Sequence, residues 1–376
     1  MSTSFGFLSS YPPTQCGLAT FSAALRSEIG RAGHETGVVR VLEHPDANVS
    51  ADVVHALVHG EPDGGGAAAS ALNAFDVVVV QHEYGIYDGP DGDSVIEVLD
   101  RLTVPAIVVL HTVLIEPTPH QRDVLNAIAA RASALITMTE TARERLVTHY
   151  DVDPSNVIVV PHGASTAPPD GRPRPHGDGP LMLTWGLLGP GKGIERVIDA
   201  LPSLRDLNAR PHYLVVGDTH PRVLERDGED YRNGLIARAA RLGVADMVTF
   251  RAGHVDVASL AALAARADVV LLPYDSREQV TSGVLIEAVT ACRPVIATAF
   301  AHAVELLASG AGLLVEHDDP AGMTAAIRQV LCEPAQAAAM VRQAALLAPD
   351  LRWGAVAARY CTVADNLLDA DIRATA

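Results

Sequence analysis

The sequence predicts an α/β protein made of two doubly wound parallel sheets, one in each half of the chain. Three observations support this class. The length of 376 residues suits two domains of about 150–200 residues each. Short runs rich in Val, Ile and Leu alternate with helix-like segments through both halves, as in parallel sheets covered by helices. A segment rich in proline and glycine, residues 166–180, separates the two halves.

In the first half, apolar runs predict buried parallel strands, because each run is rich in branched side chains and is bounded by polar or turn residues. These runs are 38–42, 75–83, 104–112, 134–139 and 156–163. Helical patterns lie between them at 21–33 and 118–132. We therefore expect residues 1–165 to form an N-terminal domain.

The second half repeats this alternation. Its apolar runs are 181–186, 212–218, 247–252, 268–274, 293–298 and 312–316. They predict a second domain over 181–350, joined to the first by the linker at 166–180, whose five prolines and three glycines exclude a helix or a central strand. Residues 351–376 are helical in pattern, and we expect them to pack back on the first domain. A cleft between two such domains is the expected ligand site.

The composition argues against several classes of protein. The formal net charge is −17 at pH 7, which disfavours nucleic-acid binding and docking on an anionic membrane, because both need basic patches. No segment approaches about 18 uncharged apolar residues, so we expect no stable membrane insertion. The N-terminus lacks the pattern of a secretory signal, and the four cysteines are far apart without metal-ligand spacing. These features predict a cytoplasmic protein with reduced thiols; they do not specify an oligomeric state.

Lys192 is the only lysine in the chain, and it lies in a glycine-rich turn between a predicted strand and a predicted helix. The turn contains Gly189, Gly191 and Gly193, which allow the backbone to bend sharply and to approach a ligand closely. The start of the next helix offers unpaired N–H groups and a partial positive charge, to which the lysine adds a full one. The turn therefore predicts a phosphate-binding site.

Two other interpretations of this turn stay open. The residues from Gly186 to Lys192 satisfy the GxxxxGK pattern of nucleoside triphosphatases, but Gly193 stands where that pattern needs a Ser or Thr hydroxyl for Mg²⁺. Alternatively, the turn is purely structural, with an exposed lysine and no ligand.

A second informative stretch, 268–298, ends a strand at Pro273 and begins a helix after a small polar loop. The run TSGVL, at 281–285, would present backbone N–H groups at the start of that helix. Glu287 follows in the first half of the helix, where its carboxylate could accept hydrogen bonds from a ribose diol. Taken alone, a glutamate in this position is more often an ordinary solvated residue.

Other polar clusters in the sequence contain residue types that occur in binding and metal sites. His82, Glu83 and Tyr84 follow a predicted strand end, where we expect contacts to an acceptor, with plain loop packing as the alternative. The triplet at 91–93 has the DxD pattern, but it lies in a turn-rich loop, and we interpret it as a solvated turn. The chain shows no HExxH or GxSxG motif and no paired histidine spacing, so we predict no metal site, no zinc protease and no α/β-hydrolase.

Several motifs follow one another in an order found in one enzyme family. They are YPPTQCGLATFSAAL at 11–25, VLHT at 109–112, VIVVPHGA at 157–164, WGLLGPGKG at 185–193, GHVDVASLAALAARADVVLLPY at 253–274, EAVTACRPVIAT at 287–298 and GAGLLVEHDD at 310–319. With them the chain resembles, over nearly its full length, the retaining glycosyltransferases of family 4 (glycosyl transferases group 1). This family has the GT-B fold, in which two Rossmann-like domains face each other across a cleft. The N-terminal motif and TSGVL look like those of its mannosyltransferases.

The resemblance implies roles for individual residues. The catalytic group would comprise Lys192, which holds the departing diphosphate, His111, beside the transferred sugar, and Glu287, which binds the ribose. The donor-binding residues that it implies are Gly17, Gly189, Gly191, Gly193, Arg251, Gly253, His254, Val255, Gln279, Thr281, Ser282, Gly283, Val284, Leu285 and Glu287. On the acceptor side we place Gly17, Leu18, His82, Glu83 and Tyr84.

Two positions depart from the family pattern. Gln279 stands where the family has the first glutamate of its acidic motif, so this position binds sugar hydroxyls but cannot act as a carboxylate. Leu187 stands where the family tends to have an arginine that grips the diphosphate. Either Lys192 works with fewer cationic partners, or Arg251 or Arg277 takes that place.

The sequence thus predicts a retaining, metal-independent hexosyltransferase without a cofactor. It would move mannose or glucose from a nucleotide-diphosphate sugar, such as GDP-mannose or UDP-glucose, to a hydroxyl of a small or oligosaccharide acceptor. Three alternatives remain: a sugar phosphorylase of the same fold, a nucleotide-sugar epimerase and a non-catalytic nucleotide-sugar-binding protein.

Overall fold

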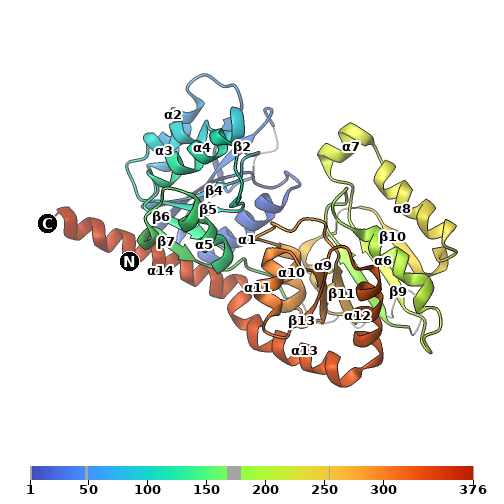
Figure 1. Ribbon diagram of the computed structural model, residues 1–376. Coiled ribbons are helices and arrows are strands. Elements are labelled where there is room, and N and C mark those ends of the chain that lie inside the picture. Colours follow the sequence, from blue (N-terminus) through green and yellow to red (C-terminus); the bar gives the residue numbers. More distant parts are fainter. Residues whose placement is uncertain (1, 47–49, 167–178, 254, 376) are drawn as a thin grey trace. The chain divides into compact units, whose positions relative to one another are not determined.

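The computed structural model describes residues 2–46, 50–166, 179–253 and 255–375. Most of the predicted linker, 167–178, and the predicted donor-binding residue His254 lie outside the described residues. Contacts between residues divide the chain into two compact units (Figure 1). Unit 1 comprises Met1–Gly163 and Trp353–Ala376, and unit 2 comprises Ala164–Arg352.

Unit 1 is built on a seven-stranded parallel sheet in the order β3-β2-β1-β4-β5-β6-β7. Its strands are β1 Ser4–Ser9, β2 Glu35–Leu42, β3 Val53–Val58, β4 Val77–His82, β5 Ala106–Leu110, β6 Ala134–Thr137 and β7 Val157–Val159. Its helices are α1 Gly17–Arg31, α2 Gly64–Leu72, α3 Val95–Asp100, α4 Pro119–Ala129, α5 Glu140–His149 and α14 Trp353–Thr375, with 3-10 turns η1 Pro90–Gly92 and η2 Pro154–Asn156. Each strand and helix predicted for the first half is confirmed, and β1 and β3 are added.

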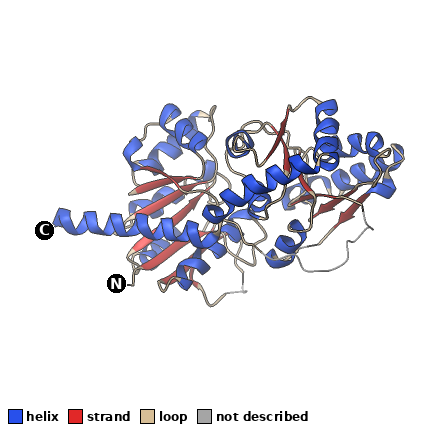
Figure 2. Ribbon diagram, turned by 90° about the horizontal axis from the view of Figure 1, so that it is seen from below, coloured by secondary structure: helices blue, strands red, loops and turns tan. Residues whose placement is uncertain are grey.

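Unit 2 is built on a six-stranded parallel sheet in the order β10-β9-β8-β11-β12-β13. Its strands are β8 Leu181–Trp185, β9 His212–Val216, β10 Val248–Arg251, β11 Val269–Leu272, β12 Val295–Thr298 and β13 Gly312–Val315. Its helices are α6 Ile194–Ala200, α7 Pro221–Asp227, α8 Asp230–Arg241, α9 Val257–Ala264, α10 Gly283–Thr290, α11 Ala301–Leu307, α12 Pro320–Cys332 and α13 Pro334–Leu347, with 3-10 turns η3 Leu201–Leu204, η4 Ala245–Met247 and η5 Ala348–Leu351. The six predicted strands of the second half are confirmed. Two doubly wound α/β units were the predicted fold class, and in each unit the strands lie between layers of helices (Figure 2).

The central strands are apolar because both faces of a parallel sheet are covered by helices. In unit 1 the four valines 77–80 of β4 are fully buried. In unit 2 the central strands β8 and β11 are buried along their whole length. Burial of this kind supplies the main stabilisation of each sheet.

The C-terminal segment belongs to unit 1. After α13, the 3-10 turn η5 ends the helix, and α14 then packs along α1. At the start of α14, the Trp353 ring meets the Phe21 ring of α1 edge-on, with 4.9 Å between their centres. Further along α14, Tyr360 is fully buried. The long helix therefore completes the core of unit 1.

The strand order places the loops where ligands bind in such folds. In both units the order reverses beside the first strand of the unit, between β1 and β4 in unit 1 and between β8 and β11 in unit 2. Doubly wound sheets bind ligands beyond the carboxyl ends of the strands at this switch point.

The four cysteines are free, and among the described helices none combines the length and apolar character of a membrane span.

Candidate nucleotide-sugar site

The glycine turn after β8 depends on glycine at particular positions. Gly186, Gly191 and Gly193 have positive φ angles of 122°, 91° and 62°. A Cβ atom on Gly193 would lie 1.8 Å from the backbone oxygen of Pro273, which leaves no room for a side chain. The Gly191 oxygen accepts a 2.9 Å hydrogen bond from the backbone N–H of Asp275. The turn is thus fixed to the loop after β11, across the switch point of the sheet.

Lys192 lies at the tip of this turn and is half-buried. Its Nζ atom lies 4.5 Å from the centre of the Tyr274 ring, a cation–π contact that holds the ammonium group in place. The Tyr274 ring in turn stacks on Phe300, with 5.2 Å between the ring centres. Within the described part of the chain, no carboxylate pairs with Lys192. The ammonium group is therefore positioned but not neutralised.

The TSGVL run begins α10 as the sequence predicts. Ser282 is the N-cap, and its Oγ accepts from the Leu285 N–H at 3.3 Å. The Ser282 N–H donates to Nδ1 of His302 at 2.8 Å, which fixes the loop to α11. Gln279 folds back on the loop, because its Nε2 donates to the Thr281 oxygen at 2.8 Å. The N–H groups of Gly283 and Val284 thus stand at a capped helix start, where an anion is favoured.

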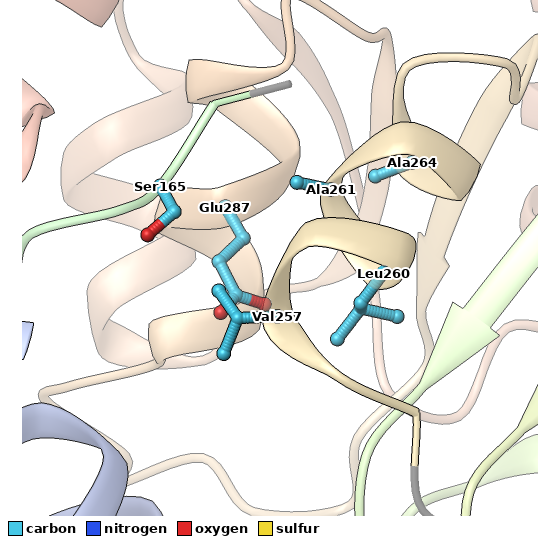
Figure 3. Close-up of a pocket in the computed structure, with 6 residues that line it drawn as sticks. All are labelled: Ser165, Val257, Leu260, Ala261, Ala264 and Glu287. Atoms are coloured by element: carbon cyan, nitrogen blue, oxygen red, sulfur yellow. The ribbon is translucent and has the colours of Figure 1, made fainter. Parts of the chain in front are cut away.

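Glu287 is not a freely solvated residue of α10. Its Oε2 accepts a 2.8 Å hydrogen bond from the indole nitrogen of Trp185, the last residue of β8. Burial raises the pKa of Glu287, and the Trp185 hydrogen bond lowers it. Figure 3 shows Glu287 extending from α10 toward Val257 of α9 in a small pocket. The lining residues are Ser165, Val257, Leu260, Ala261, Ala264 and Glu287. The pocket is apolar apart from one carboxylate and one hydroxyl.

The predicted base-binding segment after β10 is partly described. Asp218 accepts a 2.7 Å hydrogen bond from the Gly253 N–H, and the Arg251 oxygen accepts one from Gly217, so this backbone is attached to the loop after β9. The side chain of Arg251 is exposed. Arg277, the other proposed substitute for the family arginine, pairs with Asp318 at 3.0 Å.

In unit 1, the predicted glycine loop ends at the start of α1. Cys16 is the N-cap, and its sulfur accepts from the Ala19 N–H at 3.3 Å. Gly17 is exposed, and a Cβ atom there would meet nothing within 4 Å. Leu18 is half-buried. The exposed glycine leaves the backbone of the first turn open to a ligand.

Two histidines pack against Phe21, and a third lies at the carboxyl end of β4. The rings of His111 and His162 each lie 5.0 Å from the Phe21 ring, and His82 is 1% exposed at the end of β4. Burial lowers the pKa of His111 to about 3, with smaller contributions from His162 and His82. Burial also lowers the pKa of His82 and of His162 to about 4. At neutral pH these imidazoles are uncharged hydrogen-bonding groups, and Nε2 of His111 lies 2.7 Å from Oε1 of Gln81.

The predicted acceptor residues Glu83 and Tyr84 come directly after His82 in the sequence. Thr112 donates a 2.6 Å hydrogen bond to Glu83 Oε2, and the Tyr84 N–H donates to Oε1 at 3.1 Å. Burial raises the pKa of the Glu83 carboxyl, which these two bonds oppose. The Tyr84 hydroxyl donates to the Gln121 oxygen at 3.4 Å, and its ring meets the His82 ring edge-on at 5.1 Å. The structure therefore brings His82, Glu83, Tyr84 and His111 together at one edge of the sheet.

The DxD triplet forms contacts within the protein. Asp91 lies 2.9 Å from Nδ1 of His120 and accepts from Gln121, and Asp93 lies 3.6 Å from the other nitrogen of His120. Within the described ranges, no group of three or more His, Cys, Asp or Glu side chains is arranged to hold a metal ion.

The sequence does not predict two residues of the site, Tyr274 and Trp185. Tyr274, under the ammonium group of Lys192, ends the apolar run 268–274, so the sequence predicts it as part of a strand, whereas β11 ends at Leu272. Trp185 precedes the glycine turn and is one of only two tryptophans in the chain, a signal that could have identified it. Both contacts join residues far apart in the sequence, Trp185 and Glu287 by 102 positions.

The protein thus has two α/β units, and unit 2 carries a glycine–lysine turn and a partly buried glutamate. Comparison with known proteins identifies the family to which this architecture belongs. The sequence model of the glycosyl transferases group 1 family matches residues 171–346, and together with the relative described next it shows that the chain belongs to this family. A D-inositol 3-phosphate glycosyltransferase of Geodermatophilus obscurus is 30% identical over 341 residues, which cover 81% of this chain and 73% of the relative.

Other relatives match over a smaller part of their length. A D-inositol 3-phosphate glycosyltransferase of Streptomyces avermitilis is 31% identical over 63% of this chain, which spans 52% of that relative. A GDP-mannose-dependent α-(1-6)-phosphatidylinositol monomannoside mannosyltransferase of Mycolicibacterium smegmatis is 30% identical over 59% of each chain. The crystal structure of Anabaena HepE in complex with UDP and glucose has a TM-score of 0.75 at 15% identity, over 97% of this chain and 100% of that one. This structural likeness supports the GT-B fold.

Proposed function

We propose that the protein is a retaining glycosyltransferase that moves a hexose from a nucleotide-diphosphate sugar to a hydroxyl acceptor. The observation that carries this proposal is the position of Lys192: an ammonium group without a carboxylate partner in the described residues, held over Tyr274 in a turn where three glycines have positive φ angles. Such a group suits a diphosphate, whose negative charge rises as it leaves the sugar. Membership of the glycosyl transferases group 1 family supports the same reaction class.

The proposed step is a displacement at the anomeric carbon of the donor. The bond from that carbon to the diphosphate oxygen breaks, a bond to the acceptor oxygen forms, and the acceptor proton passes to the departing phosphate oxygen. Lys192 and the N–H groups at the start of α10 stabilise the departing charge without a metal ion. In a single displacement, retention of anomeric configuration requires that the acceptor attack on the face from which the diphosphate leaves. The family resemblance supports this stereochemistry.

We assign proposed contacts in each unit separately. In unit 2, the backbone of Arg251, Gly253 and Val255 receives the base, Glu287 the ribose, and Gln279 with TSGVL the sugar. In unit 1, the neutral imidazole of His111 lies beside the sugar, and His82, Glu83 and Tyr84 bind acceptor hydroxyls. This assignment fits the chemistry of unit 1, because uncharged imidazoles and a hydrogen-bonded carboxylate suit hydroxyl groups.

The donor that we propose is GDP-mannose or UDP-glucose. The GDP-mannose-dependent mannosyltransferase of Mycolicibacterium smegmatis, to which the chain is similar, supports GDP-mannose. The UDP and glucose in the similarly folded HepE support UDP-glucose. The N-terminal motif at 11–25 and TSGVL at 281–285, which resemble those of the family's mannosyltransferases, also favour mannose slightly.

Two observations favour a second candidate, a nucleotide-sugar-binding protein without transferase activity. Gln279 replaces the first glutamate of the acidic motif, and its amide nitrogen is already engaged with the Thr281 oxygen. Leu187 also removes the second cation expected beside the diphosphate.

The test is incubation with GDP-mannose and with UDP-glucose, with and without a panel of small polyol and oligosaccharide acceptors. A transferase releases the nucleoside diphosphate only when an acceptor is present, and the product is an α-linked glycoside. Binding without release supports the second candidate. A phosphorylase would instead release sugar phosphate from a glycoside with orthophosphate, and an epimerase would convert the donor without any acceptor.

A further inference from the structure

The hydrogen bond between Trp185 and Glu287 joins two parts of the proposed nucleotide site. Trp185 is the last residue of β8, directly before the glycine turn, and its side chain is 3% exposed. Its Nε1 donates to Oε2 of Glu287 over 2.8 Å. The geometry of α10 is thereby connected to the strand that leads into the Lys192 turn.

This bond leaves the carboxylate able to bind a diol. An ionised carboxylate has about four lone-pair positions, and an indole has one N–H to donate and no acceptor. Glu287 therefore keeps positions for two further hydroxyl donors while its orientation is fixed. A protonated carboxyl group would instead carry a proton of its own and accept less well, so binding of a diol favours the ionised form.

The surroundings of Glu287 are otherwise unfavourable to a negative charge. The pocket contains the apolar side chains of α9 (Val257, Leu260, Ala261 and Ala264) and the Ser165 hydroxyl, and none of these is charged. Burial raises the pKa of Glu287, and within the described residues the Trp185 hydrogen bond is the one contribution that lowers it. Trp185 thus supplies the stabilisation that the pocket lacks.

We propose that Trp185 is a positioning residue for the donor, which orients the Glu287 carboxylate and keeps it available to the ribose diol of a nucleoside diphosphate. This inference rests on the proposed function, because it assigns the pocket beside Glu287 to the nucleotide. Trp185 acts through Glu287 and does not itself need to touch the ligand.

The first test measures the affinities of UDP and GDP by calorimetry between pH 5 and 8 for the wild type, Trp185→Phe and Trp353→Phe. Trp185→Phe removes the N–H but keeps an aromatic ring, and we expect about tenfold weaker binding of the preferred nucleotide at pH 7. The acid limb of the affinity profile, which is the fall in affinity as the pH is lowered, should also shift to a pH about one unit higher, since Glu287 becomes harder to ionise. Trp353→Phe, in unit 1, is the matched control. It should change neither the nucleotide affinity at pH 7 nor the pH at which binding weakens in acid.

The 2′-deoxy counterpart of the preferred nucleotide separates positioning from general damage to the fold. The wild type should prefer the ribonucleotide, and Trp185→Phe and Glu287→Gln should both lose most of that preference. A merely structural role would weaken both nucleotides equally and leave the acid limb in place.

A second measurement keeps Trp185 intact, in case Trp185→Phe does not fold. In Trp353→Phe, the emission comes from Trp185 alone, since the chain has two tryptophans. The emission should change as Glu287 titrates in acid, and this transition should vanish in Trp353→Phe/Glu287→Gln. Failure of the wild type to bind either nucleotide would overturn the proposed function and the inference with it. Normal nucleotide binding together with an unchanged deoxy preference and acid limb in Trp185→Phe, or with no Glu287-dependent transition in the emission, would overturn the inference alone.

Discussion

Replacement of Lys192 by methionine should remove most of the transferase activity and little of the stability. Methionine keeps the length of the aliphatic chain and removes the charge, so the change isolates the ammonium group. In the folded protein that group makes a contact to the Tyr274 ring at 4.5 Å and, in the described residues, has no carboxylate partner. A cation–π contact of this kind contributes about 0.5–1 kcal/mol, which bounds the expected loss of unfolding free energy.

The expected effect on the reaction is much larger. A positioned donor aimed at a departing negative charge contributes about 3 kcal/mol in the transition state, which is about a hundredfold in rate. Nucleotide release with donor and acceptor present should therefore fall by two decades or more in Lys192→Met and in Lys192→Ala. Lys192→Arg keeps the charge on a different head group and should retain an intermediate rate.

The assay pairs turnover with chemical denaturation of each variant, so that loss of fold is not mistaken for loss of chemistry. If Lys192→Met were as active as the wild type, the ammonium group would have no role at the diphosphate. If it were inactive because it had unfolded, the small stability contribution assigned to Lys192 would be wrong.

Three further predictions concern residues that hold the site or the core. Tyr274→Leu should lower turnover about tenfold while Tyr274→Phe stays near wild type, because the ring and not the hydroxyl contacts Lys192; equal losses in the two variants would contradict this. Gly193→Ala should cost about 1–3 kcal/mol of unfolding free energy, because its Cβ would collide with the Pro273 oxygen, and more than Gly191→Ala, which meets nothing within 4 Å; denaturation curves decide the order. Unfolding free energy should fall as the pH falls from 7 to 5, because the unfolded chain protonates His82 near its ordinary pKa of 6.5 while burial lowers the folded pKa to about 4. At pH 5 the loss of unfolding free energy that comes from His82 is about 2 kcal/mol, and His82→Leu should remove this contribution. An unchanged pH dependence in His82→Leu would refute the assignment.

The fold could be predicted from the sequence wherever a strand is buried on both faces, since such strands are continuous apolar runs. The two missed strands lack that pattern for physical reasons. β1 contains Gly6, where a Cβ atom would lie 2.8 Å from the Phe75 ring, so packing requires the residue that weakens the strand signal. β3 is an edge strand with partly exposed side chains, and His55 interrupts its apolar character.

The candidate site was predictable at the level of single turns and not at the level of contacts. The glycine–lysine turn and the start of α10 are local patterns, so residues 186–193 and 281–285 could be found by spacing. The partners of Lys192 and Glu287 could not, because Tyr274 lies in the loop after β11 and Trp185 at the end of β8, and both meet their partners only in the folded unit. The same holds for His111 and Gln81, which belong to neighbouring strand ends.

The most direct test of the account is protection of the Lys192 side chain from an amine-reactive acylating reagent. The chain has one lysine, so mass spectrometry reads this site alone, with the N-terminal amine as an internal reference. We predict that saturating UDP or GDP slows acylation of Lys192 at least tenfold relative to that reference, whereas the corresponding nucleoside, which has no phosphate, does not. Equal acylation rates with and without a nucleotide shown to bind would contradict the claim that this ammonium group holds the diphosphate.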